Sequence, residues 1–363
     1  MSRATTIVEV ALAERTYTIE IGTGNLSEAG RFVDERMAPS HFALITDDNV
    51  ADRHARPVAE SLAENADVDI LSVEAGETAK SIATAEVLWQ KLLEVGADRG
   101  TVVVAVGGGV VGDLAGFVAA TFARGLAFVQ IPTTLLAQVD SSVGGKVGVN
   151  LPGAKNMVGA FWQPRGVLID TAVLATLPER EYRAGLAEVV KYGVILDAEF
   201  FSYLESHVTE LQARQDDVLR QVVARSCQLK ADVVKADERE ETGLRAVLNY
   251  GHTFCHAFET LTGYGQLLHG EGVSIGMTCA ARLAERLARV DGAFVRRQFE
   301  LLTALGLPTV APPLDADEVL AVMARDKKAA AGKLRFVLPT QLGHVELVGG
   351  IAESDVRAAL DSD

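Results

Sequence analysis

Three histidines stand close together in one segment of the chain, RAVLNYGHTFCHAFETLTGYGQLLH, which runs from Arg245 to His269. They are three of the seven histidines in the whole sequence. His252 and His256 are four residues apart, so a helix would place both on one face. His269 follows a glycine-containing break. With one acidic residue from another helix, these side chains could form a metal site that keeps an open coordination position.

The acidic partner could come from the segment GLAEVVKYG, where Glu188 precedes Lys191 by three residues. Taken separately, an ExxK pair is more often a solvated ion pair, and HxxxH marks a metal site in a minority of cases. His269 alone could be a loop residue. It opens the sequence HGEG, however, and the glycines there permit close approach of another group. The conjunction of these residues favours a metal site.

A glycine-rich turn, GGGVVGD at Gly107–Asp113, follows a strand-like run and precedes a helix-like segment. Its glycines would let backbone N–H groups approach a phosphate, and the helix N-terminus would favour the negative charge. Such turns are also common for packing reasons alone. The turn comes late in the chain, and no acidic residue ends the next strand, which departs from the ordinary dinucleotide-binding arrangement. The acidic pair Asp47 and Asp48 ends an earlier strand and could hold an adenosine ribose.

Several cations occupy glycine-rich or apolar stretches that are unlike an ordinary solvated surface. The clearest is Lys146, which ends the sequence VDSSVGGK. It is either a surface lysine on a capped turn or part of an anion clamp, in which glycines bring the ammonium and backbone amides to one phosphate. The other candidate cations are Arg124, Lys155, Lys191, Lys230, Lys235 and Arg245. A metal, a nucleotide and an anionic substrate are therefore all compatible with one site.

The first half of the sequence alternates strand-like and helix-like runs, which predicts a mostly parallel, helix-covered α/β sheet of Rossmann-like type. A helix is predicted over Ser81–Val95. Strands are predicted at Thr6–Leu12, Tyr17–Ile21, Phe42–Thr46, Asp69–Val73, Thr101–Val106, Phe128–Ile131 and Gly166–Asp170.

From Glu179 onward, the spacing of apolar residues predicts long helices, and LRFVLP and HVELVGG predict two short strands near the end. We expect an α/β nucleotide-binding domain over residues 1–177. A mainly α-helical metal- and substrate-binding domain would follow over residues 178–363, with the active site in the cleft between them.

Composition narrows the class of protein. The chain has 363 residues, of which 48% are hydrophobic, enough for two domains with large cores. A formal net charge of -15 argues against nucleic acid or an anionic membrane as partner, but not against a small anionic substrate. The three cysteines fit a reducing compartment. No targeting segment or bilayer-spanning run is visible, so we expect a cytoplasmic protein.

The combined motifs resemble one family closely, the 3-dehydroquinate synthases. The resemblance covers nearly the whole chain through GGGVVGDLAGF, PTTLLAQVDSSVGGKVGVN, GAKNMVGAFWQP, LPEREYRAGLAEVVKYG, LNYGHTFCHAFE, HGEGVSIGM and DKKAAAGKLRFVLP. It implies conversion of 3-deoxy-D-arabino-heptulosonate 7-phosphate into 3-dehydroquinate and phosphate, in the shikimate pathway of aromatic amino acid biosynthesis. The implied steps are transient oxidation by NAD, β-elimination of phosphate, reduction, ring opening and intramolecular aldol closure.

The resemblance also implies roles for particular residues. Zinc, replaceable by cobalt, would be bound by Glu188, His252 and His269, with His256 a catalytic residue near the substrate. NAD would contact Asp47, Glu77, Lys80, Gly109, Val110, Val111, Gly112, Asp113, Thr133, Thr134, Lys146, Lys155, Val173, Leu174, Ala175 and Thr176. The substrate's phosphate end would meet Lys146, Asn156, Lys327, Lys328 and, across a homodimer interface, Arg124. Its carboxylate and hydroxyls would meet Lys230, Arg245 and Asn249, and Asp140 and Lys191 would complete the pocket.

Cys255 departs from the family pattern, which usually has a small residue, often Gly, just before the second helix histidine. We expect its thiol to pack and not to bind a metal. The alternatives are another sugar phosphate cyclase, an iron-dependent polyol dehydrogenase, and an NAD-binding regulatory module with an inactive site. The intact carboxylate contacts favour a dehydroquinate synthase, and a glutamate at position 188 disfavours the dehydrogenase, which tends to use an aspartate there.

Overall fold

The computed structural model describes residues 5–13, 15–263, 265–325 and 334–360. The chain divides into two compact units, of which the first is Met1–Pro178 with Leu219–Arg239 and the second is Glu179–Val218 with Glu240–Asp363. Helix α8 (Asp216–Ala236) therefore packs mainly with the first unit. The predicted division into 1–177 and 178–363 differs here, because it assigns this whole helix to the second domain.

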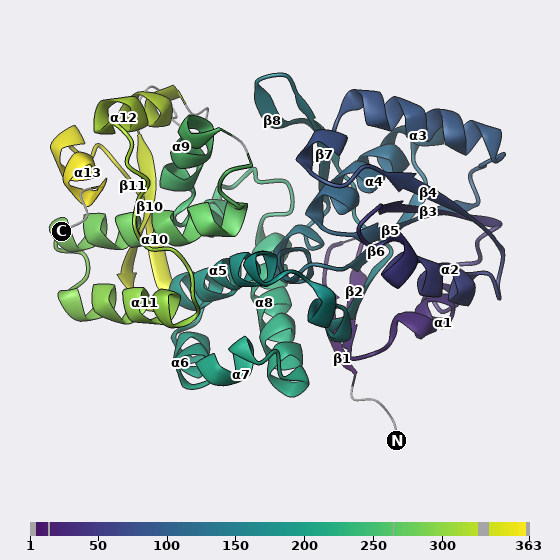
Figure 1. Cartoon of the computed structure of the whole chain (residues 1–363), viewed down its shortest axis with the longest axis horizontal. Coiled ribbons are helices and arrows are strands. Elements are labelled where there is room, and N and C mark those ends of the chain that lie inside the picture. The colour runs from purple at the N-terminus through teal and green to yellow at the C-terminus, as the bar shows by residue number, and fades with distance from the viewer. Residues whose placement is uncertain (1–4, 14, 264, 326–333, 361–363) are drawn as a thin grey trace. The chain divides into compact units, whose positions relative to one another are not determined.

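A seven-stranded sheet forms the centre of the first unit (Figure 1). Its order is β1-β2-β9-β6-β5-β3-β4, and every neighbouring pair is parallel except β1 and β2. The strands are β1 (Thr6–Val10), β2 (Tyr17–Gly22), β3 (His41–Asp47), β4 (Asp67–Val73), β5 (Thr101–Gly107), β6 (Ala127–Pro132) and β9 (Gly166–Asp170). All seven predicted strands are confirmed, with small differences at their ends.

Helices cover both faces of this sheet, and alternate residues of the central strands point to opposite faces. Phe42, Leu44 and Val104 pack with α1 (Ala29–Asp34) and α2 (Arg56–Leu62). Ala43 and Val103 pack on the other face with α3 (Ile82–Glu94) and α4 (Gly109–Thr121). Because both faces are covered, β5 (TVVVAVG) is buried along its whole length and apolar after Thr101.

An antiparallel hairpin lies outside the main sheet, formed by β7 (Lys146–Leu151) and β8 (Ala154–Phe161). Val147 and Val149 of β7 pack into the core that α3 and α4 cover. The sequence did not predict this hairpin: β7 (KVGVNL) alternates but has only six residues, and β8 (AKNMVGAF) has no regular alternation of apolar and polar residues. The short helical turns of the first unit are η1 (Leu26–Glu28), η2 (Ala51–Ala55), η3 (Glu77–Ala79), η4 (Phe122–Arg124), η5 (Ala137–Ser141) and η6 (Thr171–Thr176).

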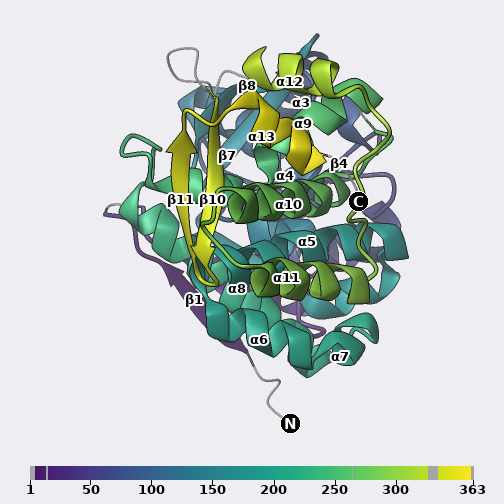
Figure 2. The same ribbon diagram turned by 90° about the vertical axis from the view of Figure 1, so that its left-hand side faces the viewer.

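The second unit is mainly helical and has one antiparallel ribbon (Figure 2). Helix α10 packs against α5, α9, α11, α13 and the ribbon strand β10, so it forms the centre of the unit. The elements are α5 (Glu179–Leu196), α6 (Ala198–Ser206), α7 (Val208–Gln212), η7 (Leu244–Asn249), α9 (His252–Thr262), α10 (His269–Arg286), α11 (Gly292–Ala304), α12 (Ala316–Arg325), β10 (Arg335–Gln341), β11 (His344–Gly349) and α13 (Glu353–Leu360). The predicted fold class, an α/β unit followed by a mainly helical one, is confirmed.

Within the part of the chain that the structure describes, no helix combines the length and apolar character needed to cross a bilayer.

Candidate functional site

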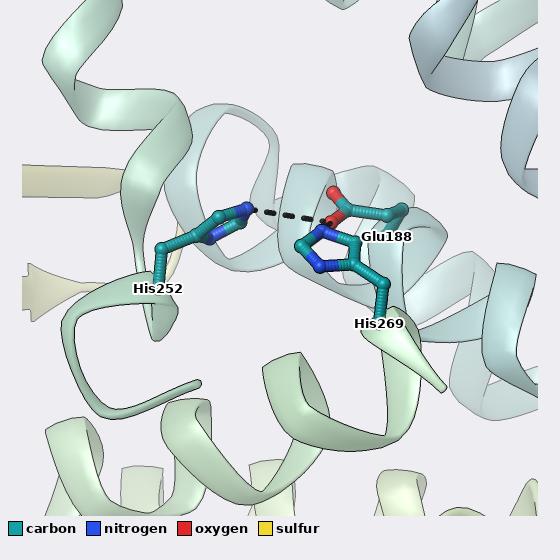
Figure 3. Close-up of side chains that lie close together, drawn as sticks. All are labelled: Glu188, His252 and His269. Atoms are coloured by element: carbon teal, nitrogen blue, oxygen red, sulfur yellow. Dashed lines mark ion pairs between the residues drawn. The ribbon is translucent and has the colours of Figure 1, made fainter. Parts of the chain in front are cut away.

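Glu188, His252 and His269 come together in the second unit, from helices α5, α9 and α10 (Figure 3). Their ligand atoms all lie within 4.8 Å of one another. His252 Nε2 is 3.7 Å and His269 Nε2 is 3.6 Å from Oε1 of Glu188. Two imidazole nitrogens and one carboxylate oxygen form the donor set of an open zinc site, so these residues fit a divalent metal.

Two glycines of α10 allow the three helices to approach this closely. A Cβ on Gly270 would lie 1.9 Å from the carbonyl oxygen of Ala184, one turn before Glu188 on α5. A Cβ on Gly276 would lie 2.1 Å from the carbonyl oxygen of Gly251, which directly precedes His252. Backbone contact at these two points therefore brings His269 and His252 to Glu188.

The two imidazole rings are oriented by bonds on their far nitrogens. Nδ1 of His252 is 3.1 Å from the Tyr250 carbonyl oxygen, to which it donates, so Nε2 faces Glu188. Burial on its own would lower the pKa of His269, but hydrogen bonds with Cys255 and with the carboxylates of Glu188 and Glu259 raise it well above its usual value. The cluster therefore attracts a positive charge, as a cation site must.

Lys191 and His256 border this cluster. Lys191 forms an ion pair with Glu188, and both side chains are almost completely buried, at 2% and 1% exposed. The interpretation as a solvated surface pair is therefore wrong. The rings of His252 and His256 lie edge to face with centroids 5.7 Å apart. His256 stands beside the cluster and outside the group of possible ligands among the described residues.

The residues expected to bind NAD, apart from Lys146 and Lys155 on the β7–β8 hairpin, lie at the carboxyl ends of the parallel strands in the first unit. Asp47 ends β3, and the glycine-rich turn follows the neighbouring strand β5. Strand order reverses between these two strands, and open α/β sheets bind ligands at such a point. The other expected residues follow β4 (Glu77 and Lys80), β6 (Thr133 and Thr134) and β9 (Val173, Leu174, Ala175 and Thr176).

The structure requires glycine at different positions of the turn for different reasons. A Cβ on Gly107 would lie 2.6 Å from Cβ of Val111, and one on Gly112 would lie 2.7 Å from Oε1 of Gln130. Packing within the unit therefore explains these two positions. Gly109 begins α4, so its backbone belongs to the N-terminus that would favour a phosphate.

Lys80, which is buried, forms an ion pair with Asp113, a half-buried residue near the start of α4. Burial raises the pKa of the Asp113 carboxyl, and Lys80 opposes this shift. Asn150, which the sequence did not indicate, donates to Glu77 Oε1 at 2.7 Å and accepts from the Asn156 amide at 2.9 Å. Asn150 thus joins the β7–β8 hairpin to the turn after β4.

The remaining candidate contacts of the first unit are split between buried and exposed positions. Lys230 on α8 is 2.8 Å from Asp140 Oδ1 and donates to the Asp140 carbonyl at 2.7 Å. Lys146 is exposed at the start of β7, and Lys155 is half-buried on β8. Arg124 is exposed in η4 and has a left-handed φ of 68°. The structure thus buries Lys230 against Asp140 and leaves Arg124 exposed.

In the second unit, Arg245 and Asn249 lie on η7, directly before the helix that begins with His252. Arg245 is buried, with Nε 3.7 Å from Oε1 of Glu240. Lys327 and Lys328 lie outside the described residues. Lys235, which belongs to the first unit, is exposed near the end of α8.

The sequence indicated no role for Glu259, although its side chain lies beside His269 of the Glu188–His252–His269 cluster. Cys255, Glu259 and His269 form a second group with ligand atoms within 4.8 Å of one another. The signal that could have indicated Glu259 is its spacing, seven residues after His252, which places both on one helix face. Cys255 is fully buried and touches Gly272, as the expectation of a packed thiol requires.

Two solved sugar phosphate cyclases share this fold over nearly the whole chain. A 2-deoxy-scyllo-inosose synthase complexed with carbaglucose-6-phosphate, NAD+ and Co2+ is 29% identical with a TM-score of 0.90, covering 98% of this chain and 99% of that one. The 2-epi-5-epi-valiolone synthase from Streptomyces hygroscopicus, with NAD+ and Zn2+ bound, is 30% identical with a TM-score of 0.88, covering 96% and 97%. The fold and the cluster thus define a cyclase of this class.

Sequence comparison resolves the class further. The family models described as 3-dehydroquinate synthase N-terminal and C-terminal match residues 70–184 and 185–329. The 3-dehydroquinate synthase of Rhodopirellula baltica is 51% identical over 361 residues, covering 97% of this chain and 96% of its own length. The chain belongs to the 3-dehydroquinate synthase family. The predicted family and the prediction of a lyase-type cyclase are confirmed.

Proposed function

We propose that the chain converts 3-deoxy-D-arabino-heptulosonate 7-phosphate into 3-dehydroquinate and phosphate, with NAD and a divalent metal as cofactors. The observation that carries the proposal is the meeting of Glu188, His252 and His269 in a chain about half identical to a 3-dehydroquinate synthase over nearly its whole length. The reaction needs both a nucleotide and a metal, and the chain supplies a set of residues for each.

The cluster in the second unit would hold zinc or cobalt. A metal bound there would make a substrate hydroxyl more acidic and polarise the ketone formed from it. Glu188 supplies the negative charge that offsets the metal, and Lys191 holds the carboxylate by an ion pair. His256, beside the cluster, contacts the substrate in this proposal.

The residues at the carboxyl ends of β3, β4, β5, β6 and β9 would hold NAD. Bound NAD would supply a transient hydride acceptor that is regenerated within each turnover. Asp47 receives amide hydrogen bonds from Asn49 and Val50, and burial raises the pKa of its carboxyl. Its place at the end of β3 suits a contact with ribose hydroxyls.

The substrate carries a carboxylate and a phosphate, so an acidic protein must gather cations for it. Lys230 and Arg245 are buried cations held in place by acidic partners, Asp140 and Glu240. A buried, oriented cation stabilises a substrate carboxylate more than a solvated one does. Lys146 and Asn156 would contact the phosphate end, with Lys327 or Lys328 and with Arg124 of a second chain in a homodimer. Homodimer formation and a cytoplasmic location are parts of this proposal that the family resemblance supports.

The test is phosphate release from the heptulosonate phosphate in the presence of zinc and substoichiometric NAD, with absorbance followed for NADH. Release of more phosphate than the NAD supplied, without NADH accumulation, is the expected result. Glucose 6-phosphate is the control substrate, because it has no carboxylate for Lys230 and Arg245. If the zinc-loaded protein released phosphate only from another sugar phosphate, it would belong to a different cyclase activity. If it accumulated NADH with a simple polyol, the dehydrogenase reading would replace the proposal.

A further inference from the structure

Glu259 is a buried carboxylate at the edge of the proposed metal centre. Glu259 lies on helix α9 and is 7% exposed. Its Oε1 lies 3.4 Å from Nδ1 of His269 on α10. His252 begins the same helix two turns earlier. One face of α9 therefore carries a proposed ligand and also a group that touches a second proposed ligand.

The contact determines which nitrogen of His269 carries its proton. An ionised carboxylate can only accept a hydrogen bond, so Nδ1 of His269 must donate to Glu259. When Nε2 gives up its own proton, as binding to a metal requires, its lone pair is directed toward Oε1 of Glu188, 3.6 Å away. The ring orientation and the tautomer are thus those that a metal at the Glu188 side requires.

Cys255 adds a second point of attachment from α9. Its Sγ donates to the backbone carbonyl of His269 at 3.7 Å. Gly272 leaves room for the thiol, because a Cβ there would lie 2.7 Å from Sγ. His252 is oriented by a carbonyl two residues away in its own chain segment, whereas His269 depends on another helix for both its ring and its backbone.

We propose that Glu259 is a positioning residue, which fixes the ring and the tautomer of His269 for metal binding. The inference deepens the proposed function and rests on its metal centre. Outer carboxylates on ligating histidines raise the basicity of the ligand, and their loss typically weakens metal binding by ~10–100-fold. Glu259 itself does not touch the metal in this arrangement.

The test uses the full chain, freed of metal with a chelator, and the substitution Glu259→Gln, which keeps the size of the side chain. Zinc affinity is measured by competition with a chromophoric chelator, and the visible absorption of the Co2+-loaded protein reports the ligand geometry. We expect zinc affinity to fall ~10–100-fold and the Co2+ spectrum to change. Thr260→Ala, at the adjacent exposed position of α9, is the matched control and should alter neither. Because the amide oxygen of Gln can still accept from Nδ1, Glu259→Leu, which cannot accept a hydrogen bond, is measured beside it; unchanged affinity and spectrum in both variants would overturn the proposal.

Two further measurements separate this proposal from its neighbours. If E259Q does not fold, as judged by circular dichroism, Glu259→Asp replaces it; the shorter acid keeps the charge but loses the contact, so zinc affinity should still fall. A wild-type chain that binds no zinc would refute the metal centre as well as the role of Glu259, whereas zinc binding unaffected by either variant refutes that role alone. Binding of two zinc ions, reduced to one by Cys255→Ser, would make Glu259 a ligand and overturn the positioning role.

Discussion

At the scale of single residues, the structure separates two histidines that sequence spacing makes equivalent. His252 and His256 share a face of α9. Among the described residues, however, only His252 forms a possible metal-binding group with Glu188 and His269. We expect His252→Ala to weaken zinc binding by more than the ~10–100-fold that loss of an outer partner costs. Zinc content after gel filtration measures this, and a stoichiometric zinc content in the variant would contradict the ligand assignment.

His256→Ala is the matched substitution one turn further along the helix. It should leave zinc binding unchanged while turnover falls, because His256 lies beside the cluster and contacts the substrate in our proposal. The expected loss in kcat is ~100-fold or more, the scale of a positioned acid–base group. Parallel loss of zinc in both variants would mean that the two histidines act as one ligand pair.

His54 provides a pH-dependent prediction in the first unit. Burial lowers the pKa of His54. Its ring nitrogen Nε2 is 2.8 Å from Thr176 Oγ1 and donates to it, because the Thr176 hydroxyl donates to the Val173 carbonyl. The folded state therefore binds fewer protons than the unfolded state just below the usual histidine pKa of ~6.5. The contribution to stability is complete above that value and is lost as the pH falls toward the lowered pKa.

We expect the free energy of unfolding to fall more steeply between pH 7.5 and 5.5 in the wild type than in His54→Gln, whose side-chain amide can keep the bond to Thr176. Urea unfolding followed by tryptophan fluorescence measures this, because Trp89 and Trp162 both lie in the first unit. An equal slope in the two proteins would show that His54 titrates alike in the folded and unfolded chains.

At the scale of elements, close contact between helix backbones allows Glu188, His252 and His269 to come together. Gly270→Ala would place a Cβ 1.9 Å from the Ala184 carbonyl, so α10 must move away from α5. We expect a loss of ~1–3 kcal/mol in the free energy of unfolding, typical of an overpacked core, together with weaker zinc binding. Gly292→Ala on α11 is the control, since its Cβ would meet the end of the flexible Glu285 side chain. Equal effects of the two substitutions would refute the special role of Gly270.

The same scale shows what the sequence could predict and what it could not. Buried strands such as Thr101–Gly107 follow from continuous apolar runs, and the helix over Ile82–Glu94 follows from its period and its Ser81 cap. The β7–β8 hairpin was not predicted because β7 is short and β8 (AKNMVGAF) lacks regular alternation; packing of Val147 and Val149 into the core stabilises it. Helix α8 has an ordinary amphipathic sequence, and periodicity does not tell which unit its apolar face will contact.

Site residues show the same limit. The spacing of His252 and His256 and the presence of His269 indicated a metal site, but family motifs were needed to select Glu188 among the chain's 49 acidic residues. Glu259 cannot be singled out by residue type, because many other glutamates of the chain are exposed to solvent. Its significance comes from burial against His269, a contact between two helices that sequence periodicity does not describe.

At the scale of the whole molecule, the two compact units should respond separately to their ligands. Bound ligand stabilises the folded state by RT ln(1 + [L]/Kd), about 2.7 kcal/mol at a concentration of 100 Kd. The proposed metal ligands all belong to the second unit, and both tryptophans belong to the first. Far-UV circular dichroism reports helices of both units, whereas tryptophan fluorescence reports the first unit alone.

We therefore expect removal of zinc to lower the thermal midpoint seen by circular dichroism more than the midpoint seen by fluorescence. Addition of NAD should raise the thermal midpoint seen by fluorescence, since most of the expected NAD contacts lie at the ends of strands in the first unit. The chain crosses between the units after Pro178, Val218 and Arg239. Different shifts of the two midpoints would therefore be strong support for the division into two units. Identical shifts of both midpoints with either ligand would mean that the three crossings make the units unfold as one cooperative body, and that metal and nucleotide stabilise the chain as a whole.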